Sequence, residues 1–318
     1  MTIDEVQKIP AIMDVAQYLI DNKIANLILT GSSARKLIKS PHRNLLPGRV
    51  IQCRLDPLSL SEIKKDDPVI EALLNYGSLP GIYTLSNPAH QNAELRSYVT
   101  TFLEEEIRAE ALVRNVPSFS RFLELAAAEA GKIINFSQLS QQIGVAHTTI
   151  MEYYQILEDC LVAERISPYT QSATRAKLTR APKYLFFDLG VRRAAAQEGR
   201  KPPLSVMGML FEQWVGMELL RLIRPMNQPV HLRFWRDPSG PEVDWLLESD
   251  NQLIPIEVKW TDTPGHQDMK HLKLFLNEYP QAKKGYVICR TATPLKLSEK
   301  ILAIPWQMLD ETISRHFR

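Results

Sequence analysis

The amino-acid sequence predicts an α/β protein of several domains. Its 318 residues are enough for two or three domains. A helical pattern over residues 12–22 is followed by the apolar run 26–30, which ends in Gly31-Ser32-Ser33 and is typical of a buried parallel strand. Residues 210–289 again alternate between helical and strand patterns. Helices and strands that alternate in this way are typical of α/β folds.

The first half of the chain supplies most of the expected helices. Thr2–Gln7 is read as the end of a strand that carries two adjacent acids, and Arg49–Leu55 as a further strand. One face of the helix at 12–22 is apolar, at Ile12, Val15, Ala16 and Leu19. The pattern is helical from Leu60 to about Leu112, with breaks at Gly77, Pro80 and Pro88.

Residues 119–187 have the outline of a helix-turn-helix followed by two strands. Pro117-Ser118 marks the boundary before this block. Helices are expected over 120–130, 137–143 and 148–157, with Gly144 in the turn, and strands over 160–163 and 183–187.

A hairpin near the carboxyl end brings ionisable residues together. If its turn is centred between Asp250 and Asn251, Asp244 faces Glu257 and Glu242 faces Lys259. Residues two apart share a face of a strand, so all four side chains are expected on one side. Opposed Cβ atoms lie about 5 Å apart, and two carboxylates that close repel unless a cation or a proton lies between them.

Composition narrows the class of protein. The net charge of +2 gives no global basic field, and the three cysteines are far apart, which argues against a disulfide framework and a zinc site. No apolar run reaches the roughly 18 residues of a membrane span, and no signal peptide is evident. We therefore expect a cytoplasmic protein without membrane contacts.

Ordered motifs along nearly the whole chain resemble one family of prokaryotic proteins. They are Asp4-Glu5-Val6-Gln7-Lys8-Ile9-Pro10, Leu29-Thr30-Gly31-Ser32-Ser33-Ala34-Arg35, Leu46-Pro47-Gly48-Arg49 with Pro57-Leu58-Ser59, Phe234-Trp235-Arg236, Glu242-Val243-Asp244 and Pro255-Ile256-Glu257-Val258-Lys259. The sequence resembles AAA-like, archaeal-type P-loop ATPases that end in a domain of unknown function (DUF4143) with a PD-(D/E)XK nuclease-like fold. Each motif is weak alone, but the ordered set is specific.

The resemblance implies ATP and Mg²⁺ as cofactors of the N-terminal part. Asp4 and Glu5 then occupy the Walker B position, where Asp4 acts on the magnesium shell and Glu5 orients the attacking water. Four further residues are implied near the phosphates, namely Ser32, Ser33, Arg35 and Arg49. No G-x-x-x-x-G-K-[ST] loop, which would hold the phosphates, exists in the chain. We therefore expect that this chain by itself does not bind ATP.

The missing loop and its strand predict a truncated P-loop core with two unpaired strand edges. A truncated gene model and a degenerate paralogue are the two explanations considered. In the alternative interpretation, Asp4-Glu5 is a solvated helix start.

The hairpin also has the pattern of PD-(D/E)XK nucleases, in which an aspartate precedes Glu-x-Lys on the next strand. The metal ligands expected for Mg²⁺ are Asp244, Glu257 and Glu212, the last on the helix 210–223. Lys259 is expected to stabilise phosphate charge or to position a water. In the structural alternative, Glu242 and Lys259 form a plain ion pair and Asp244 accepts a hydrogen bond from a turn.

A basic segment could contact DNA. Residues 165–187 contain no acid, and the expected nucleic-acid-binding residues are Arg175, Lys177, Arg180 and Lys183. A solvated charged face and a protein-binding winged helix are the alternatives.

The predicted domains are a truncated P-loop ATPase core (1–58), a helical lid (59–116), a winged helix (117–187) and a PD-(D/E)XK nuclease-like domain (188–318). Three functions compete: an ATPase, an Mg²⁺-dependent nuclease, and a non-enzymatic scaffold that binds DNA or a protein partner.

Overall fold

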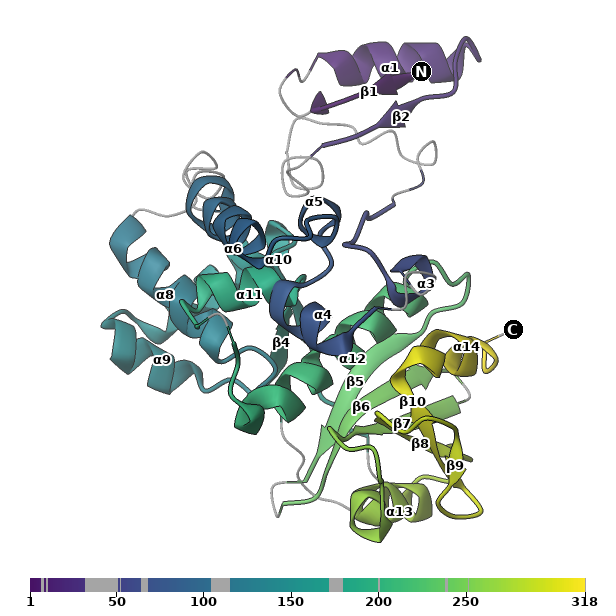
Figure 1. The fold of residues 1–318 in the computed structure, drawn as a ribbon. Coiled ribbons are helices and arrows are strands. Elements are labelled where there is room, and N and C mark those ends of the chain that lie inside the picture. The colour runs from purple at the N-terminus through teal and green to yellow at the C-terminus, as the bar shows by residue number, and fades with distance from the viewer. Residues whose placement is uncertain are drawn as a thin grey trace.

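The computed structural model describes residues 1–6, 9, 11–31, 51, 53–63, 68–103, 115–171, 180–199, 201–237, 240–250 and 252–317. Along the chain these residues form a small N-terminal unit, a group of helices, and a six-stranded sheet with helices against it (Figure 1). In the part of the chain described, none of the helices combines the length and apolar character that crossing a bilayer requires.

The N-terminal unit consists of two short parallel strands and one helix. β1 (Thr2–Ile3) pairs with β2 (Ile28–Leu29), and α1 (Ile12–Asp21) connects them. Val6, Met13 and Ala16 form its core. The expected helix at 12–22 is confirmed, but Val15 is exposed because the face that meets the strands is centred on Met13 and Ala16.

The described residues of the expected strand 49–55 form no strand. Residues 51 and 53–55, the ones described, lie in no strand. Ile51 and Leu55 are 92% and 101% exposed, and no described strand pairs with them. An extended segment without a ladder partner leaves its backbone polar groups to water, so the apolar side chains alone do not fix it as a strand.

The helical region expected from Leu60 is confirmed for the described residues as far as Leu103, and residues 64–67 and 104–112 lie outside the described part. Its helices are α3 (Leu60–Ile63), α4 (Ile70–Tyr76), α5 (Pro80–Tyr83), α6 (Pro88–Ser97) and the π-helix η3 (Tyr98–Leu103). The expected break at Pro88 is found, because α5 ends at Tyr83 and Pro88 begins α6, where the side chain of Asn87 accepts from the amide of Ala89.

Three helices and a two-stranded antiparallel sheet follow. They are α8 (Val116–Ala128), α9 (Phe136–Ile143), α10 (His147–Asp159), β3 (Ala163–Ile166) and β4 (Lys183–Phe186). Gly144 ends α9 with φ of +80°, as the turn requires. The first strand begins three residues later than expected, because Leu161, with φ of +58°, lies in the turn after α10.

The C-terminal part is built on one mixed sheet with strand order β5-β6-β7-β8-β10-β9. The strands are β5 (His231–Arg236), β6 (Glu242–Ser249), β7 (Gln252–Val258), β8 (Gly285–Cys289), β9 (Leu295–Lys296) and β10 (Ile301–Pro305). β7, β8 and β10 are mutually parallel, and the other pairs are antiparallel. The two last strands were not predicted.

Helices cover both faces of this sheet. α12 (Met207–Ile223) and α14 (Leu309–Ser314) pack on one face, and α13 (Lys270–Glu278) packs on the other. The remaining elements are α11 (Leu189–Ala195) and the 3₁₀ turns η4 (Leu204–Val206), η5 (His266–Met269) and η6 (Trp306–Met308).

The helices α3 and α4 share the core of α12. Glu218 of α12 accepts from the amide of Leu60 at 2.8 Å and from Arg221 at 2.6 Å. Arg221 in turn donates to the carbonyl oxygens of Leu58 and Phe187. One buried ion pair therefore holds two separate chain segments, at residues 58–60 and at Phe187, against α12.

Candidate carboxylate–lysine site

The hairpin register predicted from the sequence is confirmed. β6 and β7 pair from Ser249↔Gln252 through Trp245↔Ile256, the register given by a turn between Asp250 and Asn251. The ladder pairs end there. Asp244 and Glu257, one position further along each strand, are both buried.

The carboxylate of Asp244 is fixed by the opposite strand. Its Oδ2 accepts from the backbone N–H of Val258 at 2.8 Å. The expectation that Asp244 accepts a hydrogen bond thus holds, but the donor belongs to β7 rather than to a turn. The Asp244 side chain of β6 therefore lies against the end of β7.

Glu257 and Lys259 form an ion pair along β7. Nζ of Lys259 lies 2.7 Å from Oε1 of Glu257, and the Lys259 side chain stays one-third exposed. The second oxygen of Glu257, Oε2, is buried and has no hydrogen-bond partner among the described residues. A buried unpaired carboxylate oxygen is costly, which marks it as an acceptor for a group that could enter the site.

Glu212 and Lys183 complete the cluster from α12 and β4. Nζ of Lys183 lies 2.8 Å from Oε1 of Glu212 and 4.9 Å from the centre of the Trp245 ring. The indole N–H of Trp245 donates to the backbone oxygen of Glu212 at 2.9 Å. Gly216 permits this packing, because a Cβ there would lie 2.6 Å from the Trp245 ring.

Burial and mutual repulsion shift the acids toward their neutral forms. Burial, followed by the Glu212 and Glu257 carboxylates, raises the pKa of Asp244 well above its usual value. Burial also raises the pKa of Glu257, against the effect of Lys259. Burial alone would lower the pKa of Lys183, but Glu212 and Asp244 outweigh it, so that pKa is raised. Nearby carboxylates likewise outweigh burial at Lys259 and raise its pKa, so two charged ammonium groups lie beside the Asp244 and Glu257 carboxyls, which resist ionisation.

The donor chemistry fits a hard divalent cation only in part. Asp244 and Glu257 offer carboxylate oxygens, among them the unpaired Oε2 of Glu257. Glu212 is bonded to Lys183, and Glu257 to Lys259. Within the described ranges, no group of three His, Cys, Asp or Glu residues is arranged to hold a metal ion. The two lysines supply the positive charge here.

Glu242 takes a partner other than the one considered from the sequence. It pairs with Arg236 of β5 at 2.8 Å. The described ion pair of Lys259 is with Glu257, so the alternative of a plain Glu242–Lys259 pair is not found.

The acids of the N-terminal unit lie at the carboxyl end of β1. Oδ1 of Asp4 accepts from the hydroxyl of Thr30, which follows the neighbouring strand β2, and from the amide of Glu5 at 3.0 Å. Asp4 and Glu5 lie between β1 and a 3₁₀ turn that includes Val6. Ser32, Ser33, Arg35 and Arg49 lie outside the described residues.

Of the residues expected to bind nucleic acid, Lys183 is placed differently from the prediction. Lys183 is 7% exposed and bonded to Glu212, so it does not lie on a surface that a phosphate backbone could reach. Arg180 is exposed. Arg175 and Lys177 are outside the described part of the chain.

Three family models match successive parts of the chain. Residues 1–64 match an AAA domain, residues 68–201 a domain of unknown function (DUF8612), and residues 207–309 a domain of unknown function (DUF4143).

Three relatives that match the chain are uncharacterized proteins. A protein of Mycobacterium tuberculosis and one of Mycobacterium bovis are each 26% identical over 266 residues, which cover 83% of this chain and 59% of the relative. The chain thus spans about three-fifths of the mycobacterial relatives. A protein of Methanocaldococcus jannaschii is 24% identical, and the alignment covers 95% of this chain and 70% of the length of that relative.

A crystal structure of a Vibrio cholerae protein aligns with 95% of this chain and 71% of its own, at 13% identity and a TM-score of 0.26, too low to infer a shared fold. The order of the family models matches the motifs at both ends of the sequence. The chain therefore combines an N-terminal part that matches an AAA domain with a C-terminal part that matches DUF4143.

Proposed function

We propose that the C-terminal domain has a PD-(D/E)XK nuclease-like fold and acts on nucleic acid as part of an AAA-like ATPase. The observation that supports this most is the placement of Asp244, Glu257 and Lys259 on one hairpin, with an unpaired buried oxygen on Glu257. In this proposal α3–η3 act as a helical lid, and α8–β4 form a winged helix that presents nucleic acid or a protein partner to the site.

Each residue of the site has a role that its surroundings favour. Asp244 and Glu257 would hold Mg²⁺, and Glu212 would join them as a ligand if its ion pair with Lys183 were broken. A bound Mg²⁺ would supply Lewis-acid polarisation of a phosphate oxygen. Lys259, whose ammonium group is partly exposed, would stabilise negative charge on the phosphate. Asp244 is oriented by the Val258 amide before any ligand enters.

The proposal is tested by DNA cleavage with the full chain in Mg²⁺ or Mn²⁺. Asp244→Asn and Lys259→Ala should each lower the cleavage rate by at least about a hundredfold, because the first removes a proposed Mg²⁺ ligand and the second removes the ammonium group that would stabilise the phosphate. Glu248→Gln is the matched control, since Glu248 lies on the same strand but pairs with Arg233 at 2.9 Å. Equal rates in all four proteins would refute the catalytic assignment.

A second candidate, a non-enzymatic nucleic-acid or protein scaffold, is favoured by the two ion pairs. Lys183–Glu212 and Lys259–Glu257 neutralise the cluster without a metal ion. A scaffold that binds DNA should shift DNA in a salt-sensitive manner with no turnover in Mg²⁺ or Mn²⁺. Cleavage that is lost in Asp244→Asn would exclude this candidate.

The nucleotide function of the N-terminal part is a separate proposal. Asp4 beside Thr30, at the ends of two parallel strands, suits the Walker B position. Calorimetry with a non-hydrolysable ATP analogue and Mg²⁺ tests whether residues 1–64 bind nucleotide in this chain. If the titration shows no saturable heat of binding, ATP binding by this chain is excluded.

A further inference from the structure

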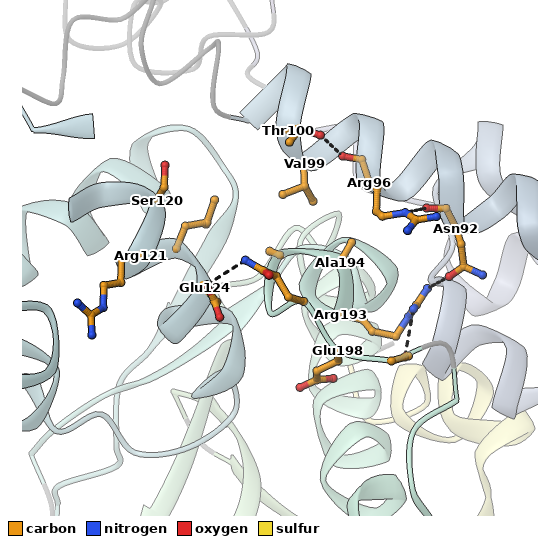
Figure 2. A pocket seen from close by; sticks show the side chains of 14 residues that line it. Asn92, Arg96, Val99, Thr100, Ser120, Arg121, Glu124, Arg193, Ala194 and Glu198 are labelled. Carbon is orange, nitrogen blue, oxygen red and sulfur yellow. Dashed lines mark hydrogen bonds between the residues drawn. The ribbon is translucent and has the colours of Figure 1, made fainter. Parts of the chain in front are cut away.

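A cavity of about 720 Å³ lies between three helical elements of the middle of the chain. Its walls come from α6 and η3, from α8, and from α11 with the turn that comes after it (Figure 2). None of these elements contributes to the carboxylate–lysine site, so ligand binding in this cavity does not depend on the function proposed for the C-terminal domain.

Two guanidinium groups meet at Asn92 on one wall. Arg193 is 5% exposed and donates to the side-chain oxygen of Asn92 at 2.6 Å, while Nε of Arg96 donates to the backbone oxygen of the same residue at 3.3 Å (Figure 2). The other acceptors of Arg193 are the backbone oxygens of Asn75 and Gly199. All of these acceptors are neutral.

The carboxylates of the cavity are already bonded elsewhere. Glu198 pairs with Arg192 at 2.5 Å, and Glu124 accepts from the amide of Gln197 at 3.0 Å. Burial lowers the pKa of Arg193 more than Tyr76 and Glu198 raise it, and the nearby Arg96 lowers it further. Two like charges therefore lie together with no bonded acid among the described residues, an arrangement that an anion would stabilise.

We propose that this cavity binds the phosphate group of a small phosphorylated ligand. A guanidinium has five N–H donors, and Arg96 uses only one of them in the contacts described, so a fork remains for a phosphate. The volume is in the range of small-molecule sites and accommodates a mononucleotide. Val99, Leu123 and Ala194 provide an apolar wall for the remainder of the ligand.

Calorimetry of the full chain with inorganic phosphate and then with AMP tests the proposal. Arg96→Gln removes the exposed guanidinium and only one hydrogen bond, so the fold should persist, as an unchanged unfolding midpoint would show. Arg121→Gln is the control, because Arg121 also lines the cavity but directs its charge away from Arg193 (Figure 2).

We expect AMP to bind at one site, with Arg96→Gln weakening it by about tenfold or more and Arg121→Gln by no more than about twofold, since a charge-assisted hydrogen bond to phosphate is lost only in the first. No binding of phosphate or AMP at millimolar concentration would overturn the proposal. Equal losses in the two variants, or binding of duplex DNA but not of AMP, would overturn it too.

Discussion

The backbone N–H of Val258 donates to the carboxylate of Asp244 at 2.8 Å. A side chain of β6 thus bonds the end of β7, beyond the last pair of the ladder, Trp245↔Ile256. This contact directs a buried acid toward Glu257, which Lys259 holds from one side. The acids converge because the hairpin register places Asp244 and Glu257 opposite each other, one position beyond the last ladder pair.

Replacing Asp244 separates its hydrogen bond from its charge. Asp244→Ala should lower the free energy of unfolding by about 1–3 kcal/mol, because the Val258 amide loses its acceptor in a buried site. Asp244→Asn keeps an oxygen acceptor and removes a charge that burial disfavours, so its stability should lie within about 1 kcal/mol of the parent. Urea unfolding measures both. An alanine variant as stable as the asparagine variant would show that the contact does not stabilise the fold.

Lys183 should matter for stability rather than for DNA binding. Lys183→Met leaves Glu212 without its ammonium partner in a largely buried site, which should cost about 2–4 kcal/mol. Arg180→Gln, at an exposed position of the same segment, should change stability by less than about 0.5 kcal/mol.

Chemical unfolding and a DNA shift assay on both variants separate the two roles. If Arg180→Gln weakens DNA binding and folded Lys183→Met does not, the corrected placement is supported. A loss of DNA affinity in folded Lys183→Met alone would contradict it.

Sequence patterns located the site but not its internal bonding. The Asp-Asn turn and the alternation of side chains were enough to give the β6–β7 register, and with it the proximity of Asp244 and Glu257. A run of basic residues could not show that Lys183 points inward. The signal that could have done so is its position at the start of an apolar strand, together with Glu212 in the apolar helix α12, since a buried acid needs a cation.

Other features were not predicted correctly because they depend on contacts between segments far apart in the chain. The strand expected at 49–55 has an apolar pattern, but a strand also needs a neighbour to bond, which the local pattern does not report. Asn92, Arg96 and Arg193 are brought together by the packing of α6 on α11, far apart in the chain.

The stability of the contact between α10 and β4 should depend on pH through Glu158. Burial raises the pKa of Glu158 above its usual 4.5, despite the hydrogen bond from Tyr184 at 3.1 Å. The folded protein thus holds this proton more tightly than the unfolded chain, and the resulting stability is complete below about pH 4.5 and is lost as pH rises through the raised pKa.

Glu158→Gln keeps a hydrogen-bond acceptor but does not titrate. The free energy of unfolding of the parent should therefore fall relative to this variant as pH rises from about 4.5 through the raised pKa. Urea unfolding across that range measures the difference. A difference that is constant with pH would contradict the direction of the shift.

Two glycines of α12 should respond to alanine in opposite directions. A Cβ at Gly216 would lie 2.6 Å from the Trp245 ring and 2.9 Å from Leu185, so Gly216→Ala should cost about 1–3 kcal/mol through overpacking. The nearest atom to a Cβ at Gly208 is 3.9 Å away, so Gly208→Ala should stabilise the helix by up to about 1 kcal/mol. Because Trp245 supports both Glu212 and Lys183, Gly216→Ala should also lower any cleavage rate, while Gly208→Ala should leave it unchanged. Thermal unfolding and the cleavage assay check both effects, and a Gly216→Ala variant as stable as the parent would show that α12 and the sheet are not in close contact there.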